Sequence, residues 1–350
     1  MVQVNLTTGL HFDCSDGISI LESAAKAQIA LPYSCKTGRC SSCKCKVLSG
    51  QSQPLVDELG LTTEEKEDGW ILSCARTAAS DLLIDVEDIS GFAIPTVKTL
   101  PARISSLKKL APDVLRVILR VPPNSILNYL PGQYVNVIGA GGVRRSYSIA
   151  NAPSTDGQLE LHIRAVVGGV MSNYWFSEAK TEDLVRINGP LGSFFLRETA
   201  GLDLVFLATG TGIAPIKAMI ETMPELAASK LPRSVTVVWG GRAQDDMYLD
   251  VDAMPGNHVF IPVLSRASSS WSGARGYVQQ ALLEVQPDLN KAAVYACGSD
   301  AMIHSARLAM FDAGLPSNRF YSDAFVSSAA NLAGGLGTRL SEKTASRPTI

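Results

Sequence analysis

The first part of the chain alternates apolar and polar positions in the way that β-strands do. Residues 2–6 and 10–14 predict a hairpin, and residues 81–86 predict a strand that closes the same sheet. Between them, Ser19 begins a Ser-x-x-Glu pattern, which predicts a capping box and a helix through Gln28. These elements indicate a small mixed domain.

Short strands dominate the next part of the chain. Four runs are rich in β-branched and aromatic residues and are bounded by Pro and Gly: 114–121, 133–138, 145–149 and 159–164. Such a series predicts an antiparallel β-barrel. The preceding segment has glycine, two prolines and no clear period, which is typical of a linker.

The pattern of apolar and polar residues changes again at residue 204. Three continuous apolar runs, 204–208, 234–239 and 292–296, alternate with helical stretches, which predicts a parallel α/β sheet. We therefore expect a multidomain α+β protein. Its expected parts are a first domain over 1–90, a linker over 91–100, a barrel over 101–199, an α/β domain over 200–326 and a flexible tail over 327–350.

Composition and charge narrow the class of protein. The chain has 350 residues, of which 46% are hydrophobic and 18% charged, so it can build substantial cores. The most apolar stretch, 204–220, is interrupted by two glycines and a proline, so no membrane span is expected. Without a secretion signal, the seven cysteines favour the cytoplasm. No basic stripe suggests nucleic-acid binding.

Four cysteines carry the first chemical signal. Cys35, Cys40 and Cys43 have the spacing C-x4-C-x2-C, and Cys74 follows after 30 intervening residues. This arrangement resembles the plant-type ferredoxins, in which four thiolates hold a [2Fe–2S] cluster, with Gly38 permitting the tight loop. Zinc usually takes two short cysteine pairs, and the odd number of cysteines argues against a disulfide framework. Such a cluster places the protein in an electron-transfer path.

Charge is unevenly distributed along the chain. Residues 1–90 carry 7 Lys and Arg against 13 Asp and Glu, whereas residues 91–350 carry 24 against 20. An acidic run lies between the third and fourth cysteines: Asp57, Glu58, Glu64, Glu65, Glu67 and Asp68. This run is either a docking surface for a redox partner or a solvated face of the domain.

Motifs in all three parts make a wider resemblance specific. They are Arg144–Pro153, Gly189–Glu198, Val294–Ser299 and Tyr321–Val326. With the cysteines, they identify the chain as resembling the ferredoxin–NADP reductase superfamily with an N-terminal plant-type ferredoxin domain, and within it the CDP-6-deoxy-3,4-glucoseen reductases. The resemblance implies a β-grasp ferredoxin domain, an FAD-binding barrel and an NAD(P)-binding α/β domain.

The resemblance also implies the flavin site. In the Arg145-Ser146-Tyr147-Ser148 motif, the guanidinium would bind the pyrophosphate, the tyrosine ring would stack on the isoalloxazine, and the Ser148 hydroxyl would reach flavin N5. A second phosphate-binding element would follow at the start of a helix. The further residues that the resemblance assigns to the cofactor here are His162, Arg164, Gly169, Val170, Met171 and Ser172.

A glycine-rich turn follows the first strand of the α/β domain. Gly210-Thr211-Gly212, with Pro215, would present backbone N–H groups and a helix N-terminus to a dinucleotide pyrophosphate, with Thr211 near the nicotinamide. By resemblance, Cys297, followed by Gly298, would face the nicotinamide, although position alone also allows a packed core thiol.

The last motif is an acid-x-aromatic sequence. Asp323 would position the nicotinamide or manage protons, and Phe325 would cover the flavin face. Plant reductases have Glu at the first position and end at the aromatic residue, and this chain departs from both features.

The sequence leaves the choice between NADH and NADPH open, with a slight preference for NADH. The plant reductases bind the 2′-phosphate of NADPH with residues that resemble Ser265, Arg266, Arg275 and Tyr277 of this chain. Two cations suit such a dianion. Against this, Gly240, Arg242 and Tyr248 resemble the NADH-using relatives.

The resulting hypothesis is a linear path from NAD(P)H through FAD and the [2Fe–2S] cluster to a redox partner protein. Ser148, Thr211, Cys297 and Asp323 are the expected catalytic residues. The partner would be a CDP-deoxysugar 3-dehydrase or, alternatively, a component of a mono- or dioxygenase. A ferredoxin-like carrier fused to a structural module is a third interpretation, which the flavin and glycine motifs disfavour.

Overall fold

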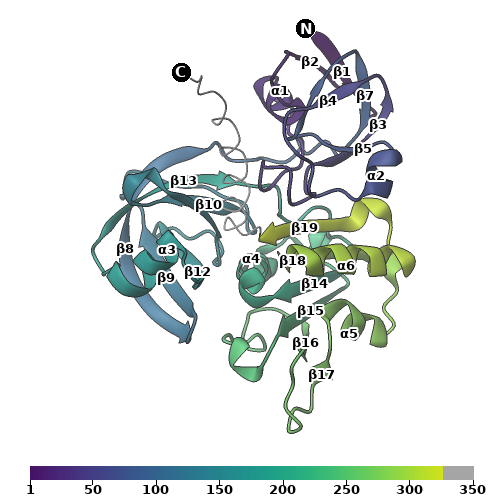
Figure 1. Cartoon of the computed structure of the whole chain (residues 1–350). Coiled ribbons are helices and arrows are strands. Elements are labelled where there is room, and N and C mark those ends of the chain that lie inside the picture. Colours follow the sequence, from purple (N-terminus) through teal and green to yellow (C-terminus); the bar gives the residue numbers. More distant parts are fainter. Residues whose placement is uncertain (326–350) are drawn as a thin grey trace, which may run out of the picture.

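The computed structural model describes residues 1–325, which form three lobes, each built on its own sheet (Figure 1). This confirms the expected multidomain architecture. The expected tail, 327–350, lies outside the described residues. Within residues 1–325, no helix combines the length and the apolar character needed to cross a membrane.

The first domain is a five-stranded mixed sheet with a small separate ribbon. Strands β1 and β7 are parallel, and the other pairs are antiparallel. The sheet order is β2 (His11–Cys14), β1 (Val2–Leu6), β7 (Leu82–Asp85), β3 (Lys44–Ser49) and β5 (Trp70–Leu72), and the ribbon pairs β4 (Ser52–Pro54) with β6 (Arg76–Ala78). The predicted hairpin and closing strand are therefore present.

Helix α1 (Ile20–Lys26) begins where the sequence predicts. The Ser19 hydroxyl accepts a hydrogen bond from the Glu22 N–H at 3.1 Å, which satisfies one of the free donors of the first turn. The helix was expected to continue through Gln28, but it ends two residues earlier. Gln28 has a φ of 62°, in the left-handed region, which a right-handed helix cannot include. A second helix, α2 (Thr63–Glu67), precedes β5.

The second domain is a six-stranded antiparallel barrel. Its strand order is β11 (Arg144–Ser148), β10 (Tyr134–Ile138), β13 (Leu184–Leu191), β8 (Lys98–Ala111), β9 (Val114–Arg120) and β12 (Gln158–Arg164). A bridge between Ile149 and Leu161 brings the two end strands together. Strand β8 begins inside the expected linker, and the short helix α3 (Val170–Asn173) lies against the barrel.

The third domain is a six-stranded parallel sheet flanked by helices, as the sequence predicts. Its order is β17 (Ala274–Arg275), β16 (Val259–Leu264), β15 (Ser234–Gly241), β14 (Asp203–Thr209), β18 (Ala292–Ser299) and β19 (Phe320–Phe325), and its helices are α4 (Ile213–Thr222), α5 (Val278–Glu284) and α6 (Asp300–Asp312). The strand order reverses between β14 and β18. Ligands of open α/β sheets bind beyond the carboxyl ends of strands at such a point.

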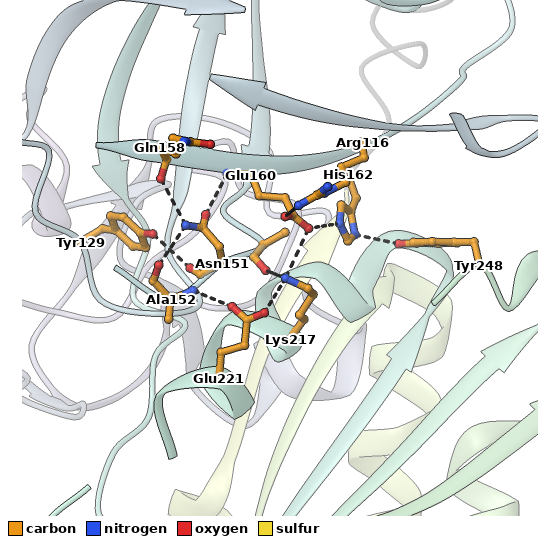
Figure 2. Close-up of polar contacts among 11 residues, drawn as sticks. Arg116, Tyr129, Asn151, Ala152, Gln158, Glu160, His162, Lys217, Glu221 and Tyr248 are labelled. Atoms are coloured by element: carbon orange, nitrogen blue, oxygen red, sulfur yellow. Dashed lines mark hydrogen bonds and ion pairs between the residues drawn. The ribbon is translucent and has the colours of Figure 1, made fainter. Parts of the chain in front are cut away.

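A buried carboxylate joins the barrel to the third domain. Glu160 on β12 binds Arg116 Nη2 at 2.6 Å and His162 Nε2 at 2.8 Å within the barrel, and Lys217 Nζ of α4 at 3.3 Å (Figure 2). Burial opposes ionisation of Glu160, but these neighbours outweigh it and lower its pKa to about 2. The negative charge of Glu160 at this interface is therefore compensated by the positive charges of Arg116 and Lys217.

Specific contacts dock the first domain on the barrel. The Tyr33 N–H donates to Ser193 Oγ at 2.7 Å, and the Ser193 N–H donates to the Tyr33 carbonyl at 2.9 Å. Arg197 also forms a two-pronged ion pair with Glu87, with Nε–Oε1 at 2.7 Å. The orientation of the first domain, which the sequence left open, is thus fixed by specific contacts.

We predict that Glu160→Gln destabilises the protein by about 3 kcal/mol, because it removes the buried carboxylate that binds Arg116 and His162 and leaves Lys217 with only Glu221 as an acidic partner. The lowered pKa means that this stabilisation is present above the ordinary carboxyl value of 4.5 and is lost as the pH falls toward 2. The difference in melting temperature between variant and wild type should therefore shrink below about pH 4.

The matched control is Glu182→Gln, which removes an exposed carboxylate paired with Arg103 in the same barrel. Exposed pairs contribute about 0–1 kcal/mol, so this variant should melt close to the wild type. Equal melting temperatures for the two variants at neutral pH would contradict the proposed role of Glu160.

Candidate functional site

A cavity of about 650 Å³ lies where the three domains meet. Its walls come from the cysteine-bearing loop, from the end of β11 and from the end of β19. The lining residues are Ser34, Cys35, Lys36, Thr37, Arg39, Val56, Cys74, Tyr134, Arg144, Arg145, Ser146, Ser148, Asp323, Ala324 and Phe325. The structure therefore brings two of the four predicted cluster cysteines, Cys35 and Cys74, and several predicted flavin residues to one cavity.

The four candidate cluster cysteines form two pairs. Cys43 and Cys74 have their sulfurs 3.2 Å apart, and the Cys35 N–H donates to Cys40 Sγ at 3.4 Å. No group of three or more His, Cys, Asp or Glu side chains in residues 1–325 could hold a single metal ion. Two thiol pairs suit a cluster of two irons, in which each iron takes two thiolates.

The loop between the cysteines has an unusual backbone that places these sulfurs. Lys36, Gly38 and Ser41 all have left-handed φ values, 56°, 73° and 57°. A Cβ on Gly38 would collide with the Asp57 carbonyl, so glycine is required there both for its φ and for space. This confirms the predicted glycine turn, whereas nothing in the sequence signals the left-handed Lys36 and Ser41.

Hydrogen bonds make two of the thiols acidic. The bond with the Cys40 thiol lowers the pKa of Cys35 to about 5, against burial, and the Thr37 N–H also donates to Cys35 Sγ at 3.3 Å. The bond with the Cys43 thiol likewise lowers the pKa of Cys74. Because the thiolate is the form that binds metal, the lowered pKa favours metal binding by one cysteine of each pair.

Strand β11 places three of the four residues of the predicted flavin motif at the cavity, and Tyr147 is not among them. Arg145, Ser146 and the buried Ser148 line it, and the Ser146 hydroxyl donates to Asn136 Oδ1 at 2.8 Å. The Tyr147 ring packs against the barrel core, where Trp175 Nε1 donates to its hydroxyl at 3.1 Å. Burial raises the pKa of Tyr147 to about 12, so its hydroxyl is neutral.

A second cavity, of about 520 Å³, lies beside the predicted phosphate-binding element. Gly169, Val170 and Met171 line it at the start of α3, although most of the Met171 side chain is buried in the barrel. The Ser172 hydroxyl accepts a hydrogen bond from the Val166 N–H at 2.9 Å and so fixes the approach to this turn.

The glycine turn lies at the switch point of the parallel sheet. A Cβ on Gly212 would collide with the Cys297 carbonyl, and a Cβ on Gly298 would collide with Thr209 Oγ1. The turn after β14 and the end of β18 therefore approach each other more closely than any side chain would permit. Pro215 is buried in the first turn of α4, where a proline costs no hydrogen bond.

Cys297 and Asp323 are neighbours at the carboxyl ends of β18 and β19. They are register partners, and both are buried. Burial raises the pKa of Cys297 well above that of a free thiol, so it is neutral. Burial also raises the pKa of Asp323, to about 6, against a hydrogen bond that Ser34 Oγ donates to Asp323 Oδ1 at 2.5 Å. Phe325, half-exposed, lines the cavity nearby.

Three residues that the sequence assigned to cofactors lie in the interface between the barrel and the third domain. His162 has Glu160 on one ring nitrogen and the Tyr248 hydroxyl on the other, at 2.8 and 3.3 Å (Figure 2). Arg164 pairs with Asp246 at 2.9 Å and lies beside Gly210. Arg164 is therefore placed to steady the glycine turn, and His162 is fully engaged by protein groups.

The residues expected at the adenosine end line the open edge of the sheet. Ser265, Arg266 and Tyr277 are exposed near the ends of β16 and β17, and Gly240 and Arg242 lie at the end of β15.

The Arg275 guanidinium is bound by three backbone carbonyls of the loop before β17. These carbonyls belong to Ala267, Ser268 and Trp271, at 3.3, 2.9 and 2.7 Å. Of the two arginines expected at a 2′-phosphate, Arg275 is thus already engaged.

Sequence reasoning missed the residues that connect the domains at the cavity. Ser34 binds Asp323 through its hydroxyl, and its carbonyl accepts from the Tyr134 hydroxyl at 2.7 Å. Ser193 and Arg197 of the barrel hold Tyr33 and Glu87. These partners lie from 100 to 289 residues apart along the chain, and no local pattern could pair them.

Half of the acidic run is neutralised inside the first domain. Glu58 binds Arg76 at 2.8 Å, Glu65 binds Lys44 at 2.5 Å, and Asp68 binds Lys46 at 2.9 Å. Asp57, Glu64 and Glu67 remain exposed. The run is therefore less acidic toward solvent than its composition suggests.

Three family models match the chain in the order of its domains. They are a 2Fe-2S iron-sulfur cluster binding domain over residues 4–79, an oxidoreductase FAD-binding domain over 101–196 and an oxidoreductase NAD-binding domain over 206–308. The cofactors of this chain are thus a [2Fe–2S] cluster, FAD and a nicotinamide dinucleotide, as the sequence predicted.

Relatives match over nearly the whole chain. The CDP-6-deoxy-L-threo-D-glycero-4-hexulose-3-dehydrase reductase of Yersinia pestis is 44% identical, over 90% of this chain and 95% of its own. The xylene/toluene monooxygenase electron transfer component of Pseudomonas putida is 34% identical, over 91% of both. The crystal structure of an Amycolatopsis cytochrome P450 reductase matches with a TM-score of 0.71 and 30% identity, over 93% of this chain and 99% of its own. The chain therefore belongs to the iron–sulfur flavoprotein reductases of the ferredoxin–NADP reductase superfamily, oxidoreductases that pass electrons from NAD(P)H through FAD and a [2Fe–2S] cluster to a partner enzyme.

Proposed function

We propose that this reductase delivers its electrons to a CDP-deoxysugar 3-dehydrase, of the kind that acts on a CDP-6-deoxy-4-hexulose. The main support is the 44% identity to the Yersinia dehydrase reductase, against 34% and 32% to oxygenase components matched over a similar length. A second reductase, from Yersinia pseudotuberculosis, has the same name and the same identity. An oxygenase component is the alternative acceptor, favoured by the likeness to the Amycolatopsis cytochrome P450 reductase.

We assign the cluster to the two thiol pairs and the flavin ring to the large cavity. FAD, when bound, accepts a hydride and releases electrons singly, and the cluster carries them onward. The residues of the chain would orient these groups. Ser148 would face the ring, the neutral thiol of Cys297 and the carboxyl group of Asp323 would close the nicotinamide side, and Arg145 would offer its charge to the pyrophosphate. Cys35 and Cys74 line the same cavity, so transfer from flavin to cluster needs no domain movement.

We further propose that NADH is the donor and that the protein works in the cytoplasm. Both terminal nitrogens of the Arg275 guanidinium already donate to backbone carbonyls, so they are not available as a pair of donors for a 2′-phosphate. Seven free cysteines among the described residues suit a reducing compartment.

Replacing Gly38 tests the assignment of the cluster. We predict that Gly38→Ala purifies with FAD but with little iron, because the added Cβ would collide with the Asp57 carbonyl and displace the loop. Iron and flavin per chain measure the effect. Gly9→Ala is the matched control, since Gly9 also has a left-handed φ, 90°, but has no atom within 4 Å of an added Cβ. Iron loss in both variants would show that strain alone, rather than the loop, is responsible.

Replacing Cys40 tests the order of the electron path. In Cys40→Ser, bleaching of the flavin by NADH should persist, while reduction of purified CDP-6-deoxy-4-hexulose-3-dehydrase should fall to background. Cys45→Ala removes a buried thiol outside the two pairs and should retain both activities. Loss of flavin bleaching in folded, FAD-loaded Cys40→Ser would refute the path. Wild-type protein that reduces an oxygenase component but not the dehydrase would refute the proposed acceptor.

Replacing Arg275 tests the donor. We expect a higher kcat/KM for NADH than for NADPH, and we expect Arg275→Ala to lower both by a similar factor, because the side chain shapes a loop. A loss confined to NADPH would instead show that Arg275 binds the 2′-phosphate.

A further inference from the structure

We propose that Arg307, on helix α6 of the nucleotide domain, is the compensating charge for the [2Fe–2S] cluster of the ferredoxin domain and raises its reduction potential. This inference rests on the proposed assignment of the cluster to the four cysteines. It gives the nucleotide domain a second role, in tuning the cluster as well as in binding the nucleotide.

Helix α6 lies directly against the cluster-bearing loop. Cys40 is 1% exposed and packs into the core of the nucleotide domain, a core to which Ile303 and Ala306 of α6 contribute. The Ser42 hydroxyl donates to the Ser322 carbonyl at 3.0 Å and fixes the loop to β19. Arg307 follows Ala306 and lines a hollow of about 210 Å³ with Ser41 and Gly60.

The guanidinium of Arg307 has polar and aromatic neighbours but no acid as a direct partner. Nη2 donates to Ser322 Oγ at 3.2 Å, and the group lies 5.3 Å from the centre of the Phe320 ring. Within the described part of the chain, no carboxylate oxygen lies within 4.0 Å of it. Glu65 attracts it from farther away, but that carboxylate is bound to Lys44 at 2.5 Å.

Such a placement is unfavourable unless a negative charge lies nearby. Burial lowers the pKa of Arg307, which reflects the cost of removing a guanidinium from water, and the charges of Glu65, Cys40 and Asp300 oppose that shift from a distance. In a loaded cluster, four thiolates and two sulfides outweigh two ferric ions, so the group is anionic. The cluster therefore places a negative charge beside Arg307, where no carboxylate of the described residues is a direct partner.

The expected consequence is a higher reduction potential. Net charge and the surroundings of the sulfurs set the potential of such clusters. Each accepted electron adds negative charge, so a fixed cation beside Cys40 stabilises the reduced form more than the oxidised form. This helps the cluster to take an electron from the flavin.

The test is an electron paramagnetic resonance redox titration of the full-length protein loaded with FAD and cluster. Arg307→Gln keeps a donor for Ser322 but removes the charge, and it should shift the midpoint potential to a more negative value. Arg307→Lys keeps the charge and should stay close to the wild type. Arg319→Gln removes another arginine of the same domain, bound to the Asn290 carbonyl at 3.0 Å, and should leave the potential unchanged.

Loosened docking is separated from lost charge by Glu87→Gln, which weakens the Arg197 ion pair between the domains without altering the surroundings of Cys40. An unchanged potential in this variant supports the proposal. The proposal is overturned if Arg307→Gln titrates like the wild type, if Arg307→Lys shifts as far as Arg307→Gln, or if both Arg307 variants lose the cluster. The titration needs no acceptor, so its result is independent of whether the dehydrase is the partner.

Discussion

The hydrogen bonds of Ser34 hold the three domains of this reductase in one arrangement. Its hydroxyl binds Asp323 of the nucleotide domain, its carbonyl accepts from Tyr134 of the barrel, and the next residue is the cluster cysteine Cys35. All of these groups are buried or nearly so, and a buried polar group left without its partner is costly. The cysteine loop is therefore held against the flavin cavity, and the path from nicotinamide to cluster is built into the folded chain.

The sequence predicted the elements and the cofactors well because each depends on local patterns. Strand runs follow from alternation, the glycine turn from its place after a buried strand, and the cluster from cysteine spacing. At Gly38 and Gly212, two backbone segments approach each other too closely for a side chain to fit between them. Glycine at these positions is therefore a requirement of the observed loop conformation. The early end of α1 at Lys26 escaped prediction because the left-handed Gln28 has no signature in its residue type.

The contacts between domains could not be predicted in the same way. Asp323 was expected to position the nicotinamide or to manage protons, and its carboxylate also binds the serine that precedes a cluster ligand. His162 was expected at a cofactor, yet both its ring nitrogens are engaged at the interface with the third domain. In both cases the residue type suited the prediction, and the partner came from a part of the chain that no spacing rule connects.

The nucleotide domain forms one interface with the barrel and another with the ferredoxin domain, and these interfaces differ in how their charges are compensated. Between the barrel and the nucleotide domain, Glu160 is surrounded by Arg116 and Lys217, so the charges balance within the protein. Against the ferredoxin domain, Arg307 has no carboxylate within 4.0 Å among residues 1–325, and Glu65, Cys40 and Asp300 act on it only from farther away. The first interface is thus complete in the polypeptide alone. Under the role proposed for Arg307, the second gains further compensation from the cluster, so assembly of the cofactor and docking of the domain are electrostatically coupled.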